Sequence, residues 1–249
     1  MAWIKAWDVT KNDQYLSAAQ DIFEDLLTGL GAPCGGQWWD KQHTGVNSIN
    51  NALFIAVAAS LANRVSDAAE CSTYKDYATK QADWFINANL LTSNNTIHDG
   101  LSFSTDCSAE GQIWTYNQGV ILGAFAELSK FSSTPSKYLD FAAQVADGAI
   151  KTLVDDNGVL TEWAGYPTTG PTASQFKGVF ARNLRALHYV RPDNAYVQFL
   201  QTNAVSIWEK NRDDVMQLGP DWQGPVTDVL APAQSSALDC LVAAAAVTG

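Results

Sequence analysis

Basic residues are scarce in this sequence of 249 residues. Lys and Arg together number 15 against 26 Asp and Glu, so the formal net charge is −11 at pH 7. A surface of this sign repels phosphate groups, and no basic patch is interleaved with aromatic residues, which argues against nucleic acid or an anionic membrane as a partner. The charge balance favours a neutral or cationic ligand.

The sequence also lacks the usual metal and cofactor motifs. Its three His stand far apart, none of them in H-E-x-x-H or near G-x-S-x-G, and its four Cys include no C-x-x-C pair. The Gly-rich stretch 29–35 contains Pro33 and follows a helical pattern, so it predicts a turn that ends a helix rather than a phosphate-binding loop. We therefore expect no metal and no cofactor, while the Cys leave one or two disulfides open.

No apolar run is long enough to span a bilayer, so we expect no membrane-spanning segment. Residues 1–7 have neither the basic start nor the apolar run of a signal peptide. By contrast, nine Trp, plentiful Asn, Gln, Ser and Thr, and the sequon Asn94-Asn95-Thr96 are typical of an extracellular protein that handles neutral sugars. If the protein is secreted, we expect its leader to have been removed from this chain.

Helical periodicity runs through the whole chain, and a Tyr-containing motif recurs at about 60 residues. The Tyr residues are Tyr15, Tyr77, Tyr138 and Tyr196. A helical unit of this length is a pair of helices packed beside its neighbours, and we predict that each motif opens the second helix of a pair. The predicted pairs are 1–9 with 13–29, 46–63 with 72–92, 113–130 with 136–153, and 176–190 with 194–210, followed by a helix at 233–247.

Short connections join the two helices of a pair, whereas long connections join one pair to the next. Because every long connection leaves the same end of a hairpin, we expect all of them on one face, and loops of this length in a compact domain are usually functional. The long connections are 30–45, 93–112, 154–175 and 211–232. Their Trp and acidic residues include Trp38, Trp39, Trp163, Trp222, Asp40, Asp99, Glu110, Glu162 and Asp221. Aromatic rings and carboxylates should therefore converge on that face.

Helix hairpins in a ring, with long loops on one side, describe an (α/α)6 toroid, an all-α fold of about twelve helices. We predict this fold in a single domain over residues 1–249, with about nine of the twelve helices present. The amphipathic pattern of Trp3, Ile4 and Trp7 starts without a capping residue before it, so we expect the chain to be truncated at its N-terminus. A toroid that lacks hairpins exposes apolar flanks and would tend to self-associate.

The stretch 112–123 joins a polar loop to an apolar helix. Tyr116, Asn117 and Gln118 follow one another at the start of that helix, after a Trp and before a Gly that lets another backbone come close. Such a cluster suits a pocket for a polyhydroxylated ligand, although a helix cap with a packed Tyr would produce the same pattern. Clusters of similar character in other loops are Trp38-Trp39-Asp40 and Asp221-Trp222-Gln223-Gly224.

Stretches from one end of the chain to the other resemble glycoside hydrolase family 76, the endo-α-1,6-mannanases of bacteria and fungi, in a form close to secreted fungal members. Each motif is short, and the order and spacing of all of them make the resemblance specific. The family's (α/α)6 toroid agrees with the hairpin repeat. The matching stretches are Ala2-Trp3-Ile4-Lys5-Ala6-Trp7-Asp8, Gly35-Gly36-Gln37-Trp38-Trp39, Asn47-Ser48-Ile49-Asn50-Asn51 with Leu53-Phe54, Asp99-Gly100-Leu101, Trp114 to Gly119, Phe176 to Phe180 with Arg182, and Gln234-Ser235-Ser236-Ala237.

The resemblance implies a retaining hydrolase of α-1,6-linked mannan, with mannan or mannooligosaccharide as its ligand. In the family two adjacent Asp act at the start of the helix that continues into Ala-Trp-Ile-Lys-Ala, and residue 1 here falls just after that point. No position of this sequence inherits the two catalytic roles, so we expect no catalytic residue in the chain. The residues that the resemblance implies as sugar-contacting are Asp99, Tyr116 and Asn117, with Trp39, Asp40, Lys177 and Trp222 as weaker candidates. For Trp39 a buried core position is an alternative, and for Lys177 an ion pair.

Three functions follow from the sequence as alternatives. The first is a glycosidase that degrades or remodels mannan and is inactive as this chain stands; were it active, Asp40 or Glu110 would be the acids to test. The second is a catalytically silent mannan-binding protein that keeps the groove. The third is a subunit completed by association with another chain. Members of the family are secreted or associated with the cell wall, which is the localisation that the resemblance implies.

Overall fold

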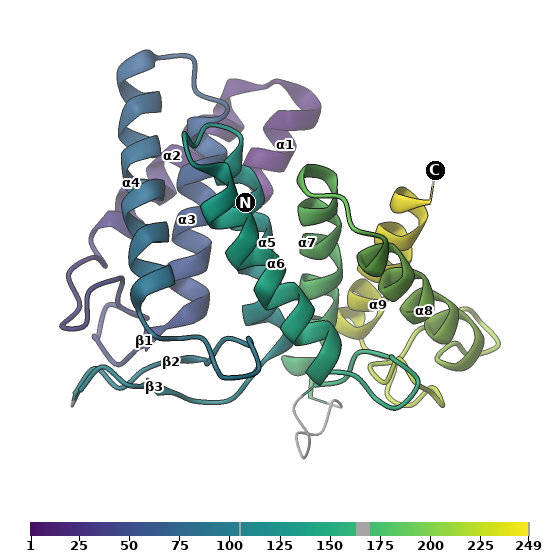
Figure 1. The fold of residues 1–249 in the computed structure, drawn as a ribbon. Helices are drawn as coiled ribbons and strands as arrows, with labels where there is room; N and C mark the ends of the chain where they lie inside the picture. Colours follow the sequence, from purple (N-terminus) through teal and green to yellow (C-terminus); the bar gives the residue numbers. More distant parts are fainter. Residues whose placement is uncertain (105, 163–169, 249) are drawn as a thin grey trace. The chain divides into compact units, whose positions relative to one another are not determined.

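Nine α-helices and three two-residue strands make up the part of the chain that the computed structural model describes, residues 1–104, 106–162 and 170–248 (Figure 1). The helices are α1 (Ala2–Thr10), α2 (Asp13–Leu27), α3 (Ser48–Ala62), α4 (Ala68–Asn87), α5 (Thr115–Ser129), α6 (Pro135–Thr152), α7 (Phe176–Val190), α8 (Asn194–Lys210) and α9 (Ala231–Val247), with a 3-10 helix at Ala173–Gln175. The strands β1 (Val46–Asn47), β2 (Gly100–Leu101) and β3 (Ala109–Glu110) form one antiparallel sheet in that order. The predicted helix pairs are confirmed, and none of the described helices is both long and apolar enough to cross a membrane.

The start of α4 differs from the predicted one. This helix begins at Ala68 because the side chain of Asp67 caps it, accepting hydrogen bonds from the backbone N–H groups of Ala69 and Glu70 at 2.9 Å each. Tyr77 therefore lies inside α4 and does not open it, so the predicted role of this Tyr is wrong. A good N-cap outweighs the hydrophobic pattern in deciding where a helix begins.

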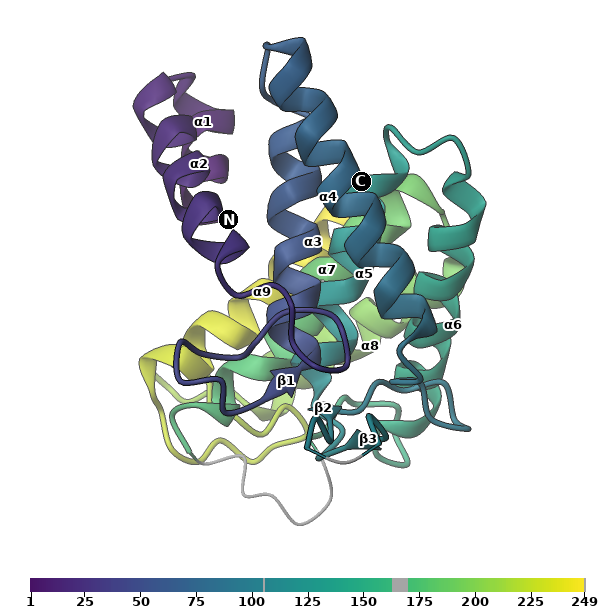
Figure 2. The same ribbon diagram turned by 90° about the vertical axis from the view of Figure 1, so that its left-hand side faces the viewer.

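The first of two compact units comprises Met1–Thr92, His98–Gly111 and Ala124–Phe141. Within it α1 packs against α2 and α3 against α4, and Figure 2 shows the two hairpins. The sequence of α3 is apolar on nearly all sides, and the helix is almost wholly buried. Phe23 of α2 packs against Phe54 of α3 and Tyr74 of α4, with ring centroids 5.0 and 5.3 Å apart. These rings form the core between the hairpins.

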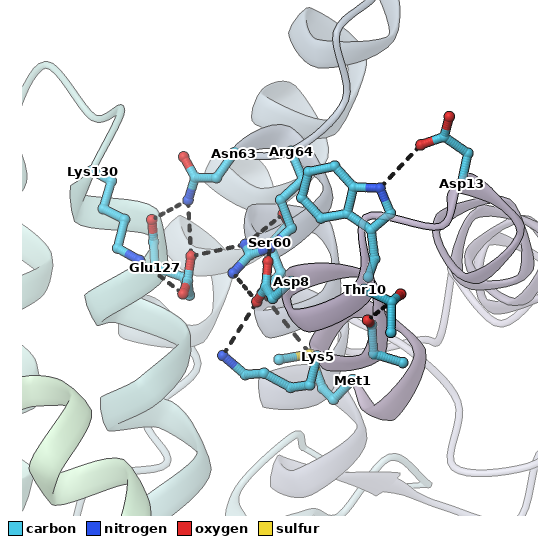
Figure 3. Close-up of polar contacts among 12 residues, drawn as sticks. Met1, Lys5, Asp8, Thr10, Asp13, Ser60, Asn63, Arg64, Glu127 and Lys130 are labelled. Atoms are coloured by element: carbon cyan, nitrogen blue, oxygen red, sulfur yellow. Dashed lines mark hydrogen bonds and ion pairs between the residues drawn. The ribbon is translucent and has the colours of Figure 1, made fainter.

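A group of charged side chains joins α1, α3 and α5 within the first unit (Figure 3). Arg64 donates to both carboxylate oxygens of Asp8, at 2.7 and 2.9 Å, and to Glu127 at 3.4 Å. Glu127 also accepts from Asn63 Nδ2 at 3.0 Å and from Lys130 Nζ at 2.8 Å. We call these five residues the Arg64 cluster. It fixes the C-terminal ends of the three helices to one another.

The second unit comprises Ser93–Ile97, Gln112–Gly123 and Ala142–Gly249, so two of its boundaries with the first fall within α5 and α6. In this unit α7 and α8 both pack on α9 (Figure 1). Gly178 lets α7 come so close to α9 that an added Cβ would lie 2.6 Å from the Cα of Ser236. The single domain expected over the whole chain stays a prediction.

Amide side chains hold several of the long loops against the helices that follow them. In three helices an Asn or Gln in the first turn accepts a hydrogen bond from the backbone of a returning loop. The amide oxygens and the N–H groups are those of Asn51 and Gln37 (2.8 Å), Gln118 and Ile97 (2.6 Å), and Gln234 and Leu218 (2.7 Å). Because a buried N–H needs a partner, these bonds position the loop ends on the helix starts.

Candidate functional site

Asp99 lines a pocket of about 220 Å³ in the first unit, which we call the Asp99 pocket. The three-stranded sheet assembles its walls, since β1 pairs with β2 and β2 with β3. Asn47 donates from Nδ2 to Asp99 Oδ2 at 3.2 Å, and the Ser48 N–H donates to the Asp99 carbonyl oxygen at 2.7 Å. The described residues that line the pocket include the acids Asp99 and Glu110 and no Lys or Arg. This lining can bond neutral hydroxyl groups and would repel an anion.

Trp39 and Asp40 line a second pocket of the first unit, of about 350 Å³, the Trp39 pocket. The Trp39 side chain is 53% exposed, so it is not a core residue. Its neighbour Trp38 stacks on His43, with ring centroids 4.6 Å apart and planes 9° from parallel. Asp40 accepts hydrogen bonds from the hydroxyl and the backbone N–H of Thr44, at 2.6 and 3.0 Å, and these bonds lower the pKa of Asp40. This carboxylate therefore stays ionised and holds its own turn.

A disulfide between Cys34 and Cys107 ties the loop that carries Trp39 to the turn between β2 and β3. The same loop is packed tightly at Gly35, whose φ is 75° and where an added Cβ would lie 2.6 Å from the Trp84 ring. One of the disulfides that the sequence left open is therefore present, and the two remaining Cys are free. The disulfide restricts the conformations that both pocket-forming loops can adopt.

Tyr116 and Asn117 lie in the first turn of α5, in the second unit. The partly exposed ring of Tyr116 packs against Phe176 with a centroid distance of 4.3 Å, and Trp114 meets the same ring edge-on at 5.6 Å. Asn117 is buried, with 1% of its surface exposed. Of the two predicted contact residues, Tyr116 is therefore the one that a ligand can reach from solvent.

Glu162 caps the start of α5. Thr115, the first residue of that helix, donates its hydroxyl to Glu162 Oε1 and its backbone N–H to Oε2, the latter at 3.2 Å. Glu162 is 5% exposed, and this burial raises its pKa to about 7, although the bonds from Thr115 and the charge of Lys177 act in the opposite direction. The position and the protonation of the Glu162 carboxyl therefore affect how the residues next to Thr115 are held at the start of α5.

Lys177, in the first turn of α7, is 1% exposed and its Nζ lies 5.0 Å from the centroid of the Trp222 ring. Among residues 1–104, 106–162 and 170–248 this nitrogen has no hydrogen-bond partner. Burial lowers the pKa of Lys177 to about 8, against the opposing influence of Glu162 and Asp221. The Trp222 face offers a cation–π contact, which compensates only part of the lost hydration.

The predicted contact residues fall into two groups, one in each unit. Those of the first unit are Asp99, Trp39 and Asp40, and those of the second are Tyr116, Asn117, Lys177 and Trp222. Within the first unit, Trp39 and Asp40 share a pocket and Asp99 lines another. Within the second, Lys177 and Trp222 contact each other in the interior, and the Lys177 Nζ has no hydrogen-bond partner among the described residues. Trp163, one of the loop Trp, lies outside the described residues.

Sequence reasoning did not select Asn47, Thr115 or Glu162 as members of a site. Asn47 opens one of the stretches that resemble the family, which was a usable signal. Glu162 was noted only as one of several loop acids, and its partner Thr115 precedes it by 47 residues. Nothing local in the sequence marks a contact over that separation.

The adjacent acidic pairs of the sequence hold turns. Asp155 Oδ1 accepts from the N–H groups of Asn157 and Val159, both at 2.9 Å. Asp213 Oδ1 accepts in the same way from residues 215 and 217, at 3.0 and 2.7 Å. Residues 155–158 form a turn, in which the Gly158 N–H donates to the Asp155 carbonyl oxygen at 3.0 Å. No group of three or more His, Cys, Asp or Glu in the described part of the chain could hold a metal ion.

The described helices form hairpins that are joined by long loops with polar pockets, and similarity to known proteins identifies the family. A family model described as glycosyl hydrolase family 76 matches residues 1–248. The chain belongs to this family. The predicted family is thereby confirmed.

Both a curated protein and a solved structure are similar to the chain. The chain is 29% identical over 213 residues to the mannan endo-1,6-alpha-mannosidase DCW1 of Saccharomyces cerevisiae, a match that covers 78% of this chain and 44% of that protein. The chain thus spans less than half the length of this relative. A crystal structure of a Listeria innocua protein is similar with a TM-score of 0.86 and 25% identity, covering 99% of this chain and 70% of that one.

A further solved relative contains a ligand. It is an inactive variant of the α-1,6-mannanase GH76A of Salegentibacter sp. HEL1_6, with two consecutive Asp replaced by Asn, in complex with α-1,6-mannotriose. Its TM-score is 0.85 at 22% identity, and the match covers 99% of this chain and 73% of that one. At this identity the likeness concerns the fold, and the predicted all-α fold class is confirmed.

Proposed function

We propose that this protein binds α-1,6-linked mannan and belongs to the machinery that degrades or remodels it. The observation that carries the proposal is the Asp99 pocket, in which two carboxylates and the Asn47 amide face a space without a basic side chain among the described lining residues. Such a lining suits the hydroxyl groups of a neutral sugar. Membership of glycosyl hydrolase family 76 supports mannan as that sugar.

The remaining candidates take complementary roles in this proposal. Trp39 offers an exposed indole face on which a pyranose ring can lie, while Asp40 keeps the turn beside it in place. Tyr116 contacts the sugar from the start of α5 through its hydroxyl, whereas Asn117 is buried and does not contact it directly. Lys177 and Trp222 support these residues without contacting the sugar, because both side chains are buried. These roles are supported by the exposure or burial of each residue and, for Asp40, by its hydrogen bonds with Thr44.

We further propose that no pair of acids within residues 1–249 cleaves the sugar. A retaining glycosidase needs an acid and a nucleophile about 5–5.5 Å apart across the scissile bond. Asp155 and Asp213 are engaged in turns, Asp40 in its bonds with Thr44, and Glu162 in capping α5. A polypeptide of residues 1–249 should therefore release no reducing ends from α-1,6-mannan. Robust turnover would refute this part and direct attention to Asp40 and Glu110.

Calorimetry with α-1,6-mannotriose and mannotetraose tests binding. We expect Asp99→Asn and Tyr116→Phe each to weaken binding by about 1–3 kcal/mol, because a sugar hydroxyl loses its partner. Asp21→Asn and Tyr189→Phe are matched controls at exposed positions and should bind as the parent does. Cellotetraose tests whether the site prefers mannose. Absence of mannooligosaccharide binding, or equal affinity in all four variants, would contradict the proposal.

An oxidising, extracellular location fits the same function. The Cys34–Cys107 disulfide is of the kind that persists outside the cytosol, and Asn94 of the sequon is exposed in its loop. We propose that the protein is secreted, as a mannan ligand in the cell wall requires. Mass spectrometry of the native protein should find one disulfide and two free thiols, and a glycan on Asn94 that an endoglycosidase removes. Four free thiols would argue against this location.

Association with another chain is a second candidate role, favoured by exposed apolar residues. On α1 they are Trp3 and Val9, and on α9 they are Leu238 and Val242. Exposed apolar patches of this kind tend to be covered by a partner. Light scattering at several concentrations tests whether copies of this chain provide that cover. A strictly monomeric species would remove self-association from the account.

A further inference from the structure

The exposed face of α8 carries no charged side chain between residues 194 and 208, all of which the structure describes. The helix packs on α9 (Figure 1), and its buried side chains include Phe199, Leu200 and Ile207. Its exposed residues over this range are Asn194, Ala195, Gln198, Gln201, Thr202, Val205 and Trp208. The exposed residues of α2, α4 and α6, by contrast, include Asp or Glu in every case. Charged side chains suit solvent as well as amides do, so exposure alone does not explain why this face lacks them.

A pocket of about 420 Å³, which we call the α8 pocket, lies on this face in the second unit. Gln198, Gln201 and Thr202 line it from α8, and Asn157 lines it from the turn that follows α6. Val205, also in the lining, is 53% exposed and adds apolar surface. Both the volume and the combination of apolar surface with a few polar groups are typical of pockets that hold small ligands.

Buried hydrogen bonds hold the turn against the helix, so the α8 pocket is formed before any ligand binds. Asn203 of α8 is fully buried, accepts from the Leu160 N–H at 2.8 Å and donates to the Gly158 carbonyl oxygen at 3.4 Å. The turn itself is fixed by Asp155, which accepts from the N–H groups of Asn157 and Val159. A pocket that is already ordered loses little conformational entropy when it binds a ligand.

The polar side chains of the pocket are free to bond a ligand. No hydrogen bond joins the side chains of Gln198, Gln201 and Thr202 to any described residue. An amide and a hydroxyl each both donate and accept, which matches the hydroxyl groups of a sugar. The charged residues of the lining, Glu209 and Lys210, have opposite signs, so the pocket offers an anion no net attraction.

An indole lies at the edge of the pocket. Trp208 follows Val205 by one turn of α8 and is 49% exposed. The guanidinium carbon of Arg212 lies 4.1 Å from the centroid of its ring, and Arg212 also donates to Met216 Sδ at 3.0 Å. These contacts hold the indole in place while half of it stays open to solvent. A fixed, exposed indole beside bonding amides offers a sugar ring an apolar surface to lie on.

We propose that the α8 pocket is a second carbohydrate site, which binds a neutral oligosaccharide through Gln198, Gln201 and Thr202, with Trp208 as a stacking surface at its edge. The proposal goes beyond the proposed function, because none of these four residues belongs to the sites around Asp99, Trp39 or Tyr116. The site holds a glycan chain and cleaves nothing. A mannan and a glucan share the neutral hexose chemistry that the pocket recognises, and the experiment distinguishes them.

NMR titration of the isotopically labelled full chain tests the site. We expect saturable shifts of the Gln198 and Gln201 side-chain amides and of the Trp208 indole N–H with α-1,6-mannotetraose, with cellotetraose, or with both. The sugar that saturates these signals identifies the glycan. Tetragalacturonate, whose rings carry carboxylates, should bind at least tenfold more weakly, because the net charge of −11 repels it.

Two variants provide the matched comparison. Gln198→Ala/Gln201→Ala should weaken binding at least tenfold, measured by the Trp208 indole signal, because two bonding amides are lost. Gln14→Ala, at an exposed position of α2, is the control and should bind as the parent does. Since all three positions are exposed, the melting temperatures should stay equal, which shows that the variants are folded.

Several results would overturn the proposal. They are the absence of shifts on α8 with either neutral sugar, equal affinity for tetragalacturonate, and parent-like binding by Gln198→Ala/Gln201→Ala. Broadening of the α8 signals with protein concentration, in the absence of sugar, would instead assign this face to contact with a second copy and would also overturn it. Asp99→Asn should leave the affinity at α8 unchanged. Shifts on α8 without shifts around Asp99 and Tyr116 would therefore support this site and contradict the proposed function, and the reverse pattern would do the opposite.

Discussion

The Arg64 cluster of the first unit contrasts with two buried residues of the second, Glu162 and Lys177, which we call the Glu162–Lys177 couple. Both regions place opposite charges among packed helices, in opposite ways. In the cluster Arg64 donates to both oxygens of Asp8, and Glu127 accepts from three side chains (Figure 3). The side chains of Arg64, Asp8 and Glu127 keep 12%, 28% and 16% exposure. In the couple Lys177 finds no hydrogen-bond acceptor in the described part of the chain.

The pKa shifts of the two regions differ in sign for that reason. Hydrogen bonds from Arg64 lower the pKa of Asp8. Burial alone would raise the pKa of Glu127, but Lys130, Arg64 and Asn63 outweigh it and lower that pKa. In the couple burial prevails, raising the pKa of Glu162 and lowering that of Lys177. Hydrogen-bonded, partly hydrated charges contribute stability, whereas a buried charge such as Lys177, which has no hydrogen-bond partner in the described part of the chain, costs stability.

The largest loss of stability is expected when only one member of the Glu162–Lys177 couple is replaced. Glu162→Gln leaves the Lys177 ammonium buried without its counter-charge and should lower the free energy of unfolding by about 3 kcal/mol at pH 7. Urea unfolding of the full-length protein measures it. Glu162→Gln/Lys177→Met should recover most of the loss, because no buried charge remains. A double variant as unstable as the single one would mean that packing, and not charge, explains the cost.

The pH profile should show the next largest effect. Glu162 has a pKa raised from 4.5 to about 7. Its stabilising contribution to the free energy of unfolding is therefore fully present below pH 4.5 and is lost as the pH rises through 7. Lys177 has a pKa lowered from 10.5 to about 8, so its contribution is present above pH 10.5 and is lost as the pH falls through 8. The two buried charges therefore lower the free energy of unfolding most between pH 7 and 8.

Unfolding experiments at pH 5 and pH 7 measure this cost. The advantage of Glu162→Gln/Lys177→Met over the parent should grow by on the order of 2 kcal/mol between the two values. The Arg64 cluster should behave oppositely, because Asp8 and Glu127 have lowered pKa values and lose their contribution only as the pH falls below about 4. A pH-independent advantage would show that the folded protein does not shift either member of the couple.

Arg64→Met should have a smaller effect than Glu162→Gln. It removes charge-assisted hydrogen bonds to Asp8 and Glu127, but both carboxylates are partly hydrated and can remain ionised, so the loss should be about 1–2 kcal/mol. Sodium chloride at 0.5 M, a condition chosen at roughly three times physiological ionic strength, should shrink this loss more than that of Glu162→Gln. Equal salt sensitivity of both variants would show that the partly hydrated Arg64 cluster and the buried Glu162–Lys177 couple do not differ in how far salt screens their charges.

The smallest effect belongs to Lys130→Ala. Lys130 is 47% exposed and contributes one of several bonds to Glu127, which keeps Asn63 and Arg64. Exposed ion pairs of this kind contribute less than about 1 kcal/mol, and we expect a loss below about 0.5 kcal/mol in urea unfolding. A loss as large as that of Arg64→Met would indicate that Glu127 depends on Lys130 and that the cluster is less redundant than its bonds suggest.

The helices were open to prediction because each is encoded by its own residues. Apolar positions repeat with the helical period, and polar or Pro-containing turns separate them, as at Asn12 before α2 and Pro135 at the start of α6. The same local signals placed Trp39, Asp99 and Tyr116 in loops or at a helix start, and these three side chains are exposed or partly exposed. Features that depend on a few neighbouring residues could be predicted from the sequence.

Contacts between distant segments were not open to prediction. The strands β1, β2 and β3 have two residues each, too few to show an alternating pattern, so the Asp99 pocket that they build has no signature of its own. The sequence alone determined the helix pairs and the polar loops, since backbone preference is local. Only the tertiary structure decided that Glu162 caps a helix starting 47 residues earlier and that Lys177 is dry. Burial and pKa depend on every segment that packs around a side chain, and no stretch of sequence contains that surrounding by itself.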